Sequence, residues 1–214
     1  MIFRDRIEAG RRLGRELRST YGNNPDAVAL GLPRGGVPVA YEVAQILDIP
    51  LDVLLVRKLG VPGHSELAMG AIASGDVRYL NPQIVRGLRL SRGAIEQVAE
   101  AETRELHRRE QLYRGDRPPL NVTDKIAIII DDGLATGATM RVAIQALRQQ
   151  QPREIVVAVP VAAVETCDEL QDVADRVFCT ETPHPFLSVG LWYNNFSQTS
   201  DQEVCQLLKE KCPA

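Results

Sequence analysis

Residues 128–140 have the sequence IIIDDGLATGATM, and this stretch decides the fold. Its three isoleucines continue an apolar run that begins at Ile126, which predicts a strand buried on both faces, as in a parallel sheet. Two aspartates follow directly, and a loop of small residues then leads into a predicted helix over 139–150. Because ligands gather where parallel strands end, this segment is the first candidate for a binding site.

The loop over 135–139 has the composition of an anion site. Gly137 lets the backbone approach a ligand closely, two threonine hydroxyls can donate, and the following helix adds its positive end. The carboxylates of Asp131 and Asp132 would repel each other by about 3 kcal/mol at a separation of about 6 Å, so a site for phosphate alone would avoid them. A ligand with both phosphate and hydroxyl groups suits both parts. We therefore predict a site for a phosphorylated ribose.

Strands and helices alternate on both sides of this segment, which predicts an α/β fold with a parallel, Rossmann-like sheet flanked by helices. A β-hairpin over 69–80, turning at Gly75-Asp76, is expected beside the sheet. We expect one domain over 1–214 with its core at 22–181. The predicted strands are 27–32, 51–56, 126–130, 154–161 and 173–179, and the predicted helices are 3–21, 37–47, 91–113, 139–150 and 201–211.

The composition excludes several classes of protein. The 214 residues are 44% hydrophobic with a net charge of −3, which is typical of a globular chain and gives no overall attraction for nucleic acid. No apolar run approaches the roughly 18 residues that span a bilayer, so we expect no membrane partner and a cytoplasmic protein. The four cysteines form no C-x-x-C pair, which argues against zinc and predicts unpaired thiols.

The segment from Asp131 to Thr139, after four apolar residues, resembles the phosphoribosyl pyrophosphate (PRPP) signature of type I phosphoribosyltransferases. The order of elements over 25–200 is similar to that family too. The resemblance implies the family's fold, a homodimer, PRPP as substrate and Mg²⁺ as cofactor. It implies that Asp131 and Asp132 hold the ribose hydroxyls and contribute to Mg²⁺ binding. The 5-phosphate would be held by Ala135, Thr136, Gly137, Ala138 and Thr139.

Pro33-Arg34-Gly35-Gly36 lies where this family places its pyrophosphate loop. Two glycines expose backbone amides and Arg34 supplies a fork of donors, which assigns Arg34 and Gly35 to pyrophosphate. Taken alone, the turn is equally well explained as a tight strand-to-helix connection. Because the family often has a non-proline cis peptide here, we predict a cis bond between Pro33 and Arg34.

Arg57 and Lys58 follow the second predicted strand. The resemblance implies that basic residues here face the pyrophosphate, ahead of a mobile loop over 59–67. An exposed position at a strand exit is an equally good interpretation. Lys58 and Glu66 are candidate catalytic residues, and His64 is a weaker candidate; in a loop, such side chains are more often solvated.

The segment 182–200 resembles the family's hood over the acceptor base. Phe186, Trp192 and Tyr193 could stack on a flat heterocycle, or could fasten the segment to the core. The arginine-rich helix over 3–21 is interpreted as a solvated face.

The implied function is transfer of the phosphoribosyl group from PRPP to a nitrogenous base, with release of pyrophosphate, in nucleotide salvage. Ala135 stands where 6-oxopurine members carry a carboxylate, which favours adenine over hypoxanthine or guanine as the acceptor. Two alternatives stay open. One is a PRPP or nucleotide sensor without turnover. The other, a kinase that makes PRPP, is less favoured because no Walker-type loop is present.

Overall fold

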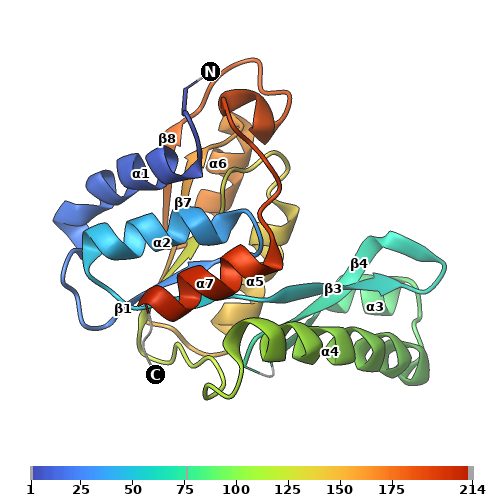
Figure 1. Cartoon of the computed structure of the whole chain (residues 1–214). Coiled ribbons are helices and arrows are strands. Elements are labelled where there is room, and N and C mark those ends of the chain that lie inside the picture. Colours follow the sequence, from blue (N-terminus) through green and yellow to red (C-terminus); the bar gives the residue numbers. More distant parts are fainter. Residues whose placement is uncertain (1, 76, 212–214) are drawn as a thin grey trace.

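The structure, a computed structural model, describes residues 2–75 and 77–211, apart from the side chains of Ser65 and Glu66. At its centre lies a five-stranded sheet in which every pair of neighbours is parallel (Figure 1). This confirms the predicted α/β fold. In spatial order the strands are β2 (Leu51–Val53), β1 (Ala27–Gly31), β6 (Ile126–Ile130), β7 (Glu154–Val161) and β8 (Arg176–Glu181).

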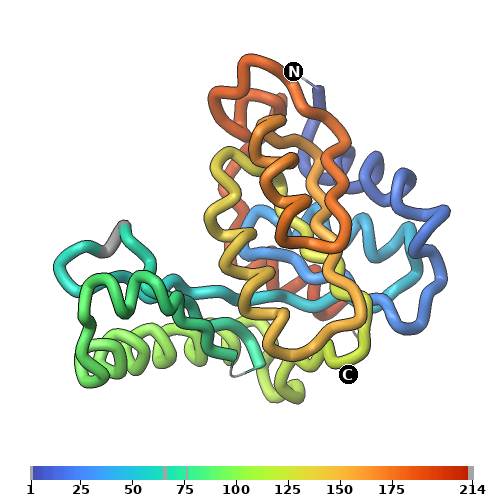
Figure 2. The backbone as a smooth tube through the Cα atoms, turned by 180° about the vertical axis from the view of Figure 1, so that it is seen from behind, coloured from blue at the N-terminus to red at the C-terminus, as the bar shows by residue number. Residues whose placement is uncertain are grey.

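Helices cover both faces of the sheet, which explains why its central strands are apolar throughout. Along β6, Ile126, Ile128 and Ile130 pack into one core, while Ala127 and Ile129 pack into the other. Figure 2 shows the second face from behind, with its two helices in front of the sheet. The first face carries α1 (Arg6–Tyr21), α2 (Gly36–Leu47) and α7 (Asp201–Lys211), and the second carries α5 (Ala138–Arg148) and α6 (Val164–Gln171).

Residues 56–114 form an arm that projects from the sheet (Figure 1). Its three strands pair antiparallel, and a long helix packs along them. Ser91 caps that helix, its hydroxyl accepting from the amide of Ala94 at 3.2 Å. In the described part of the chain, no helix combines the length and apolarity needed to cross a bilayer. The arm comprises β3 (Val56–Val61), β4 (His64–Ala73), β5 (Val77–Leu80), α3 (Pro82–Gly87) and α4 (Arg92–Arg114).

The prediction of one strand over 51–56 is wrong. The chain leaves the parallel sheet after Val53 and enters the antiparallel arm at Val56. The segment 59–67, expected to be a mobile loop, is mostly strand, because Leu59 and Val61 alternate with Gly60 and are buried. The hairpin of β4 and β5 is confirmed, although Asp76 of its predicted turn lies outside the described residues.

The expectation of unpaired thiols is also wrong for two of the four cysteines. Cys167 of α6 and Cys179 of β8 form a disulfide, with Cα atoms 6.7 Å apart. The short helix α6, which was not expected from the sequence, returns the chain onto the sheet and brings these thiols together. Cys205 keeps a free thiol, and Cys212 lies outside the described residues.

Candidate functional site

Two loops leave the parallel sheet side by side at its carboxyl edge. The connection after β1 runs to β2 on one side, whereas β6 lies on the other side of β1, so the strand order reverses between β1 and β6. Gly31 pairs with Ile130 at the ends of these strands, and the amide of Leu32 donates to the carbonyl of Ile130 at 2.9 Å. Parallel sheets bind ligands at such a switch point. The turn 33–36 and the loop 131–139 therefore flank one site.

The two glycines of the turn bring it into contact with the acidic pair. A Cβ on Gly35 would lie 2.0 Å from Oδ2 of Asp132, and one on Gly36 would lie 2.6 Å from the carbonyl oxygen of Ile130. Only residues without a side chain fit this approach. The Pro33–Arg34 peptide is cis, as predicted. Arg34 is partly exposed, with Nη1 3.9 Å from Oδ1 of Asp201.

Asp131 and Asp132 form an acidic pair at the end of β6. The amide of Asp132 donates to Oδ1 of Asp131 at 2.9 Å. Burial raises the pKa of Asp131 well above its ordinary value, and the neighbouring charge of Asp132 raises it further. Burial also raises the pKa of Asp132, but the guanidinium of Arg6 opposes that shift. These carboxylates can accept hydrogen bonds from ligand hydroxyls, and the buried charge of Asp131 is costly to leave without such a partner.

Arg6 is a site residue that the sequence analysis missed. Its Nε and Nη2 atoms each lie 2.8 Å from Oδ2 of Asp132, and its Nη1 donates to the carbonyl of Ser197 at 2.7 Å. Its guanidinium lies over the ring of Phe196, 4.0 Å from the centroid. The side chain is only 12% exposed, so the interpretation of the α1 arginines as solvated is wrong for this one. The sequence around Arg6 contains no feature that distinguishes it from the exposed arginines of α1.

The segment 135–139, predicted to be an anion site, comprises the last residues of the connection after β6 and the first two residues of α5. Gly137 has φ of +64° and directly precedes the helix, whose first amides lack intrahelical partners. The hydroxyl of Thr166 in α6 donates to the carbonyl of Ala135 at 2.6 Å. A Cβ on Gly137 would lie 2.8 Å from Cγ2 of Thr166. Helix α6 therefore fixes the loop from behind while Ala135, Thr136 and Thr139 stay exposed.

Arg57 and Lys58, the predicted pyrophosphate residues of the arm, do not contact the turn 33–36 or the acidic pair in any interaction among the residues that the structure describes. Arg57 pairs with Glu102 of α4, with Nη2 2.6 Å from Oε2. Lys58 is exposed and lines a cavity of about 540 Å³ with Pro62 and Gly63. The side chain of Glu66 lies outside the described part of the chain. The assignment of Arg57 and Lys58 to pyrophosphate thus stays a prediction.

The hood segment 182–200 packs against the N-terminal residues that precede α1. The amides of Ile2 and Phe3 donate to the carbonyl of Trp192 at 3.1 and 3.0 Å. Phe186 stacks on Trp192 with centroids 6.2 Å apart, and both rings are half-buried. Tyr193 is only 3% exposed, and its hydroxyl donates to the backbone carbonyl of Asp132 at 2.5 Å. The ring of Tyr193 therefore fastens the hood to the acidic pair, one of the two interpretations that its sequence context left open.

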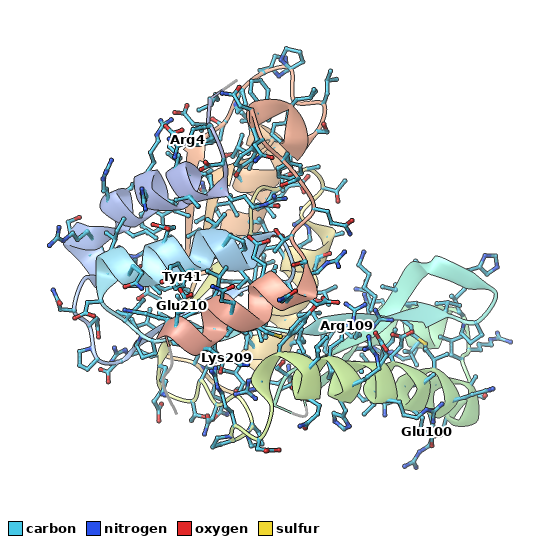
Figure 3. The ribbon with its side chains drawn as sticks, viewed as in Figure 1. Arg4, Tyr41, Glu100, Arg109, Lys209 and Glu210 are labelled. Atoms are coloured by element: carbon cyan, nitrogen blue, oxygen red, sulfur yellow. A yellow bond between two sulfur atoms is a disulfide. The ribbon has the colours of Figure 1, made fainter. Side chains whose placement is uncertain are left out.

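We predict that Tyr193→Phe costs about 1 kcal/mol of unfolding free energy, since it leaves the buried carbonyl of Asp132 without this donor. Urea denaturation measures the effect. Tyr41→Phe is the control: its hydroxyl donates to Oε2 of Glu210 at 3.0 Å on the exposed faces of α2 and α7, where water can replace it (Figure 3). Equal losses in the two variants would contradict a fastening role for Tyr193.

Comparisons with known proteins agree with this geometry. The model of the phosphoribosyl transferase domain matches residues 3–194. Two Mycobacterium tuberculosis proteins, provisionally named phosphoribosyl transferases, are 47% identical over 207 residues, covering 97% of this chain and 46% of theirs. The chain thus spans about half the length of these curated relatives. The crystal structure of TT1426 from Thermus thermophilus covers 99% of both chains at 39% identity, with a TM-score of 0.88. A uracil phosphoribosyltransferase of Lactobacillus delbrueckii is 28% identical over 141 residues, covering 63% of this chain and 64% of its own.

Proposed function

The chain belongs to the phosphoribosyl transferase family, and we propose that it transfers the 5-phosphoribosyl group of PRPP to a nitrogenous base. One observation carries the proposal. The acidic pair Asp131-Asp132 lies at the switch point of the parallel sheet, beside the glycine-containing loop 135–139. It also contacts the turn 33–36, whose close approach requires glycine at positions 35 and 36. A ligand with a phosphate at one end and a diol next to it fits both parts.

In this proposal each part of PRPP has its own group of residues. Asp131 and Asp132 accept the ribose hydroxyls, and the amides and hydroxyls of 135–139 hold the 5-phosphate. The turn with Arg34 and Gly35 holds the pyrophosphate end, since Gly35 lies against Asp132. The half-buried pair Phe186 and Trp192 offers its rings to the base.

The transfer forms a bond between a base nitrogen and C1 of the ribose while the bond from C1 to the pyrophosphate oxygen breaks. The electron pair of the broken bond leaves with pyrophosphate, and the base loses a proton to solvent. C1 carries positive charge in the transition state, as in glycosyl transfer, and the nearby carboxylates of Asp131 and Asp132 offset it. Arg34 and the amides of the turn offset the charge on the leaving group.

The acidic pair fits a magnesium ion that arrives with the substrate. Mg²⁺ is commonly held through one or two carboxylates together with substrate phosphates, and Asp131 and Asp132 provide those carboxylates. Within 2–75 and 77–211, no group of three or more His, Cys, Asp and Glu side chains is placed to hold a metal by itself. When bound, the ion would neutralise charge on the leaving pyrophosphate.

The acceptor is proposed from the residues of the loop. Position 135 is an alanine and so lacks the carboxylate that would assist proton transfer at a 6-oxopurine. This favours adenine as the acceptor over hypoxanthine or guanine. Uracil joins the panel because a uracil phosphoribosyltransferase is among the similar proteins. A homodimer is proposed from the family resemblance alone.

We predict that the chain releases pyrophosphate from PRPP and Mg²⁺ with one base of a purine and pyrimidine panel. Pyrophosphate release is measured by a coupled assay, and Asp131→Asn/Asp132→Asn provides the blank. Release that depends on one base identifies the acceptor. A protein that binds PRPP but releases no pyrophosphate with any base would instead be a sensor. Formation of PRPP from ribose 5-phosphate and ATP would indicate a kinase.

A further inference from the structure

Beside the turn 33–36 lies a cavity that the sequence analysis did not anticipate. Its volume is about 240 Å³, and its walls come from three separate parts of the chain: the turn after β1, the last turns of α4, and the start of α7. Figure 3 shows Arg109 on the side of α4 that faces β3 and the beginning of α7. The cavity is lined by Pro33, Arg34, Arg108, Arg109, Tyr113 and Asp201.

The walls of this cavity carry a net positive charge. Among the residues that line it, the three guanidinium groups of Arg34, Arg108 and Arg109 face one carboxylate, that of Asp201. Counting Glu105, which pairs with Arg108 and Arg109, three positive charges face two negative ones, so a net positive charge remains. Such a cavity attracts an anion with several oxygens, because guanidinium groups donate in pairs to phosphate oxygens.

Glu105 holds the two arginines of α4 in place. Arg108 donates to it through Nε at 2.8 Å and Nη2 at 3.0 Å, and Arg109 donates through Nε at 2.8 Å. Hydrogen bonds from Arg108 and then Arg109 lower the pKa of Glu105 to about 2, so it stays charged. Since a guanidinium carries five donors, these bonds leave each arginine further donors for a ligand.

The opposite wall is fixed to the start of α7. The buried Tyr113 donates its hydroxyl to Oδ1 of Asp201, the same oxygen that lies 3.9 Å from Nη1 of Arg34. Asp201 therefore links Tyr113 of α4 to Arg34 of the turn, although its contact with Arg34 is long. Because this contact is long, Arg34 can exchange it for a bound anion at a small cost in free energy.

We propose that Arg108 and Arg109 bind the pyrophosphate group of PRPP from the side opposite the turn, and hold the pyrophosphate that is released. This inference rests on the proposed function, which places the pyrophosphate at Arg34 and Gly35. It adds two residues of α4 to those assigned to pyrophosphate, while the assignment of Arg57 and Lys58 to pyrophosphate stays a prediction. The arm thus supplies two residues of the site.

The test is a calorimetric titration with inorganic pyrophosphate and, separately, with ribose 5-phosphate, both in the presence of Mg²⁺. For Arg108→Gln/Arg109→Gln we expect at least about a tenfold loss of pyrophosphate affinity, the effect of about one charge-assisted hydrogen bond. The affinity for ribose 5-phosphate should stay within about twofold, because the residues that hold it in the proposed function are unchanged.

The matched control is Arg92→Gln/Arg104→Gln, which removes the same charge from exposed positions of the same helix outside the cavity. It should leave both affinities unchanged. The single variants Arg108→Gln and Arg109→Lys repeat the test should the double variant melt early. Unchanged pyrophosphate affinity, an equal loss in the control, or no pyrophosphate binding by the unaltered protein would each overturn the proposal.

Failure of the proposed function has a different signature. In that case the unaltered protein releases no pyrophosphate with any base, while its affinity for inorganic pyrophosphate still depends on Arg108 and Arg109. The anion site would then stand without the transfer reaction.

Discussion

Changing Asp131 to Asn is expected to stabilise the ligand-free protein and to weaken PRPP binding by at least about tenfold. The carboxylate is buried next to Asp132, and both facts raise its pKa. Removing its charge relieves that cost, and the amide oxygen can still accept from the amide of Asp132. A gain of about 1 kcal/mol would raise the melting temperature by about 2–4 °C for a chain of this size. A ligand hydroxyl, however, loses a charged acceptor, which is worth about 1.5–3 kcal/mol.

The sign of the pH dependence follows from the same shift. Because the folded-state pKa of Asp131 lies above its ordinary value of 3.8, its contribution to stability is present below that value. That contribution is lost as the pH rises through the folded-state pKa. The ligand-free protein should therefore lose stability over this range, and Asp131→Asn should lose less.

Thermal melts between acidic and neutral pH, with and without PRPP, measure both effects. Asp168→Asn, which removes an exposed carboxylate of α6, is the control and should change neither the melting temperature nor its shift with PRPP. Lower stability of ligand-free Asp131→Asn, or an undiminished shift with PRPP, would show that Asp131 has a structural rather than a binding role.

The parts of the site that the sequence predicted are those that a short segment determines alone. The strand 126–130, the acidic pair and the small-residue loop are contiguous, so apolar periodicity and loop composition were enough to place them. The turn at Gly35 and Gly36 follows a strand in the same way. Their meeting in space follows from the strand order, because a parallel sheet brings the carboxyl ends of β1 and β6 together.

The parts that the sequence did not predict depend on long-range packing. Arg6 and Arg15 both lie on α1, yet the side chain of Arg6 is only 12% exposed beside Asp132 and Arg15 is exposed. Long-range packing also decides the partner of Arg57, which pairs with Glu102 of the helix α4, distant in sequence. Nothing near an arginine in sequence tells which partner it meets. The early exit from the sheet at Val53 was missed for a related reason, since both sheets use similar apolar residues.

Of the changes to stability, the largest is expected at the ion pair between Arg114 and Asp52. Arg114, 7% exposed at the end of α4, donates through Nε at 3.0 Å and Nη2 at 2.9 Å to the carboxylate of Asp52 on β2. It also donates to the carbonyl of Pro118 at 2.8 Å. Breaking such a pair leaves a buried charge without a partner, which costs about 3–5 kcal/mol.

We therefore expect Arg114→Met to lower the unfolding free energy by about 3 kcal/mol in urea denaturation. Arg148→Met is the control, because Arg148 makes a similar two-pronged contact with Asp175 at 2.9 Å but is 38% exposed, and such pairs contribute at most about 1 kcal/mol. Asp52→Asn/Arg114→Met should recover part of the loss, since it removes both charges. Equal costs at Arg114 and Arg148 would contradict the role of burial.

Because Arg114 anchors the same end of α4 that carries Arg108 and Arg109, Arg114→Met should also weaken pyrophosphate binding, and the double variant should not restore it.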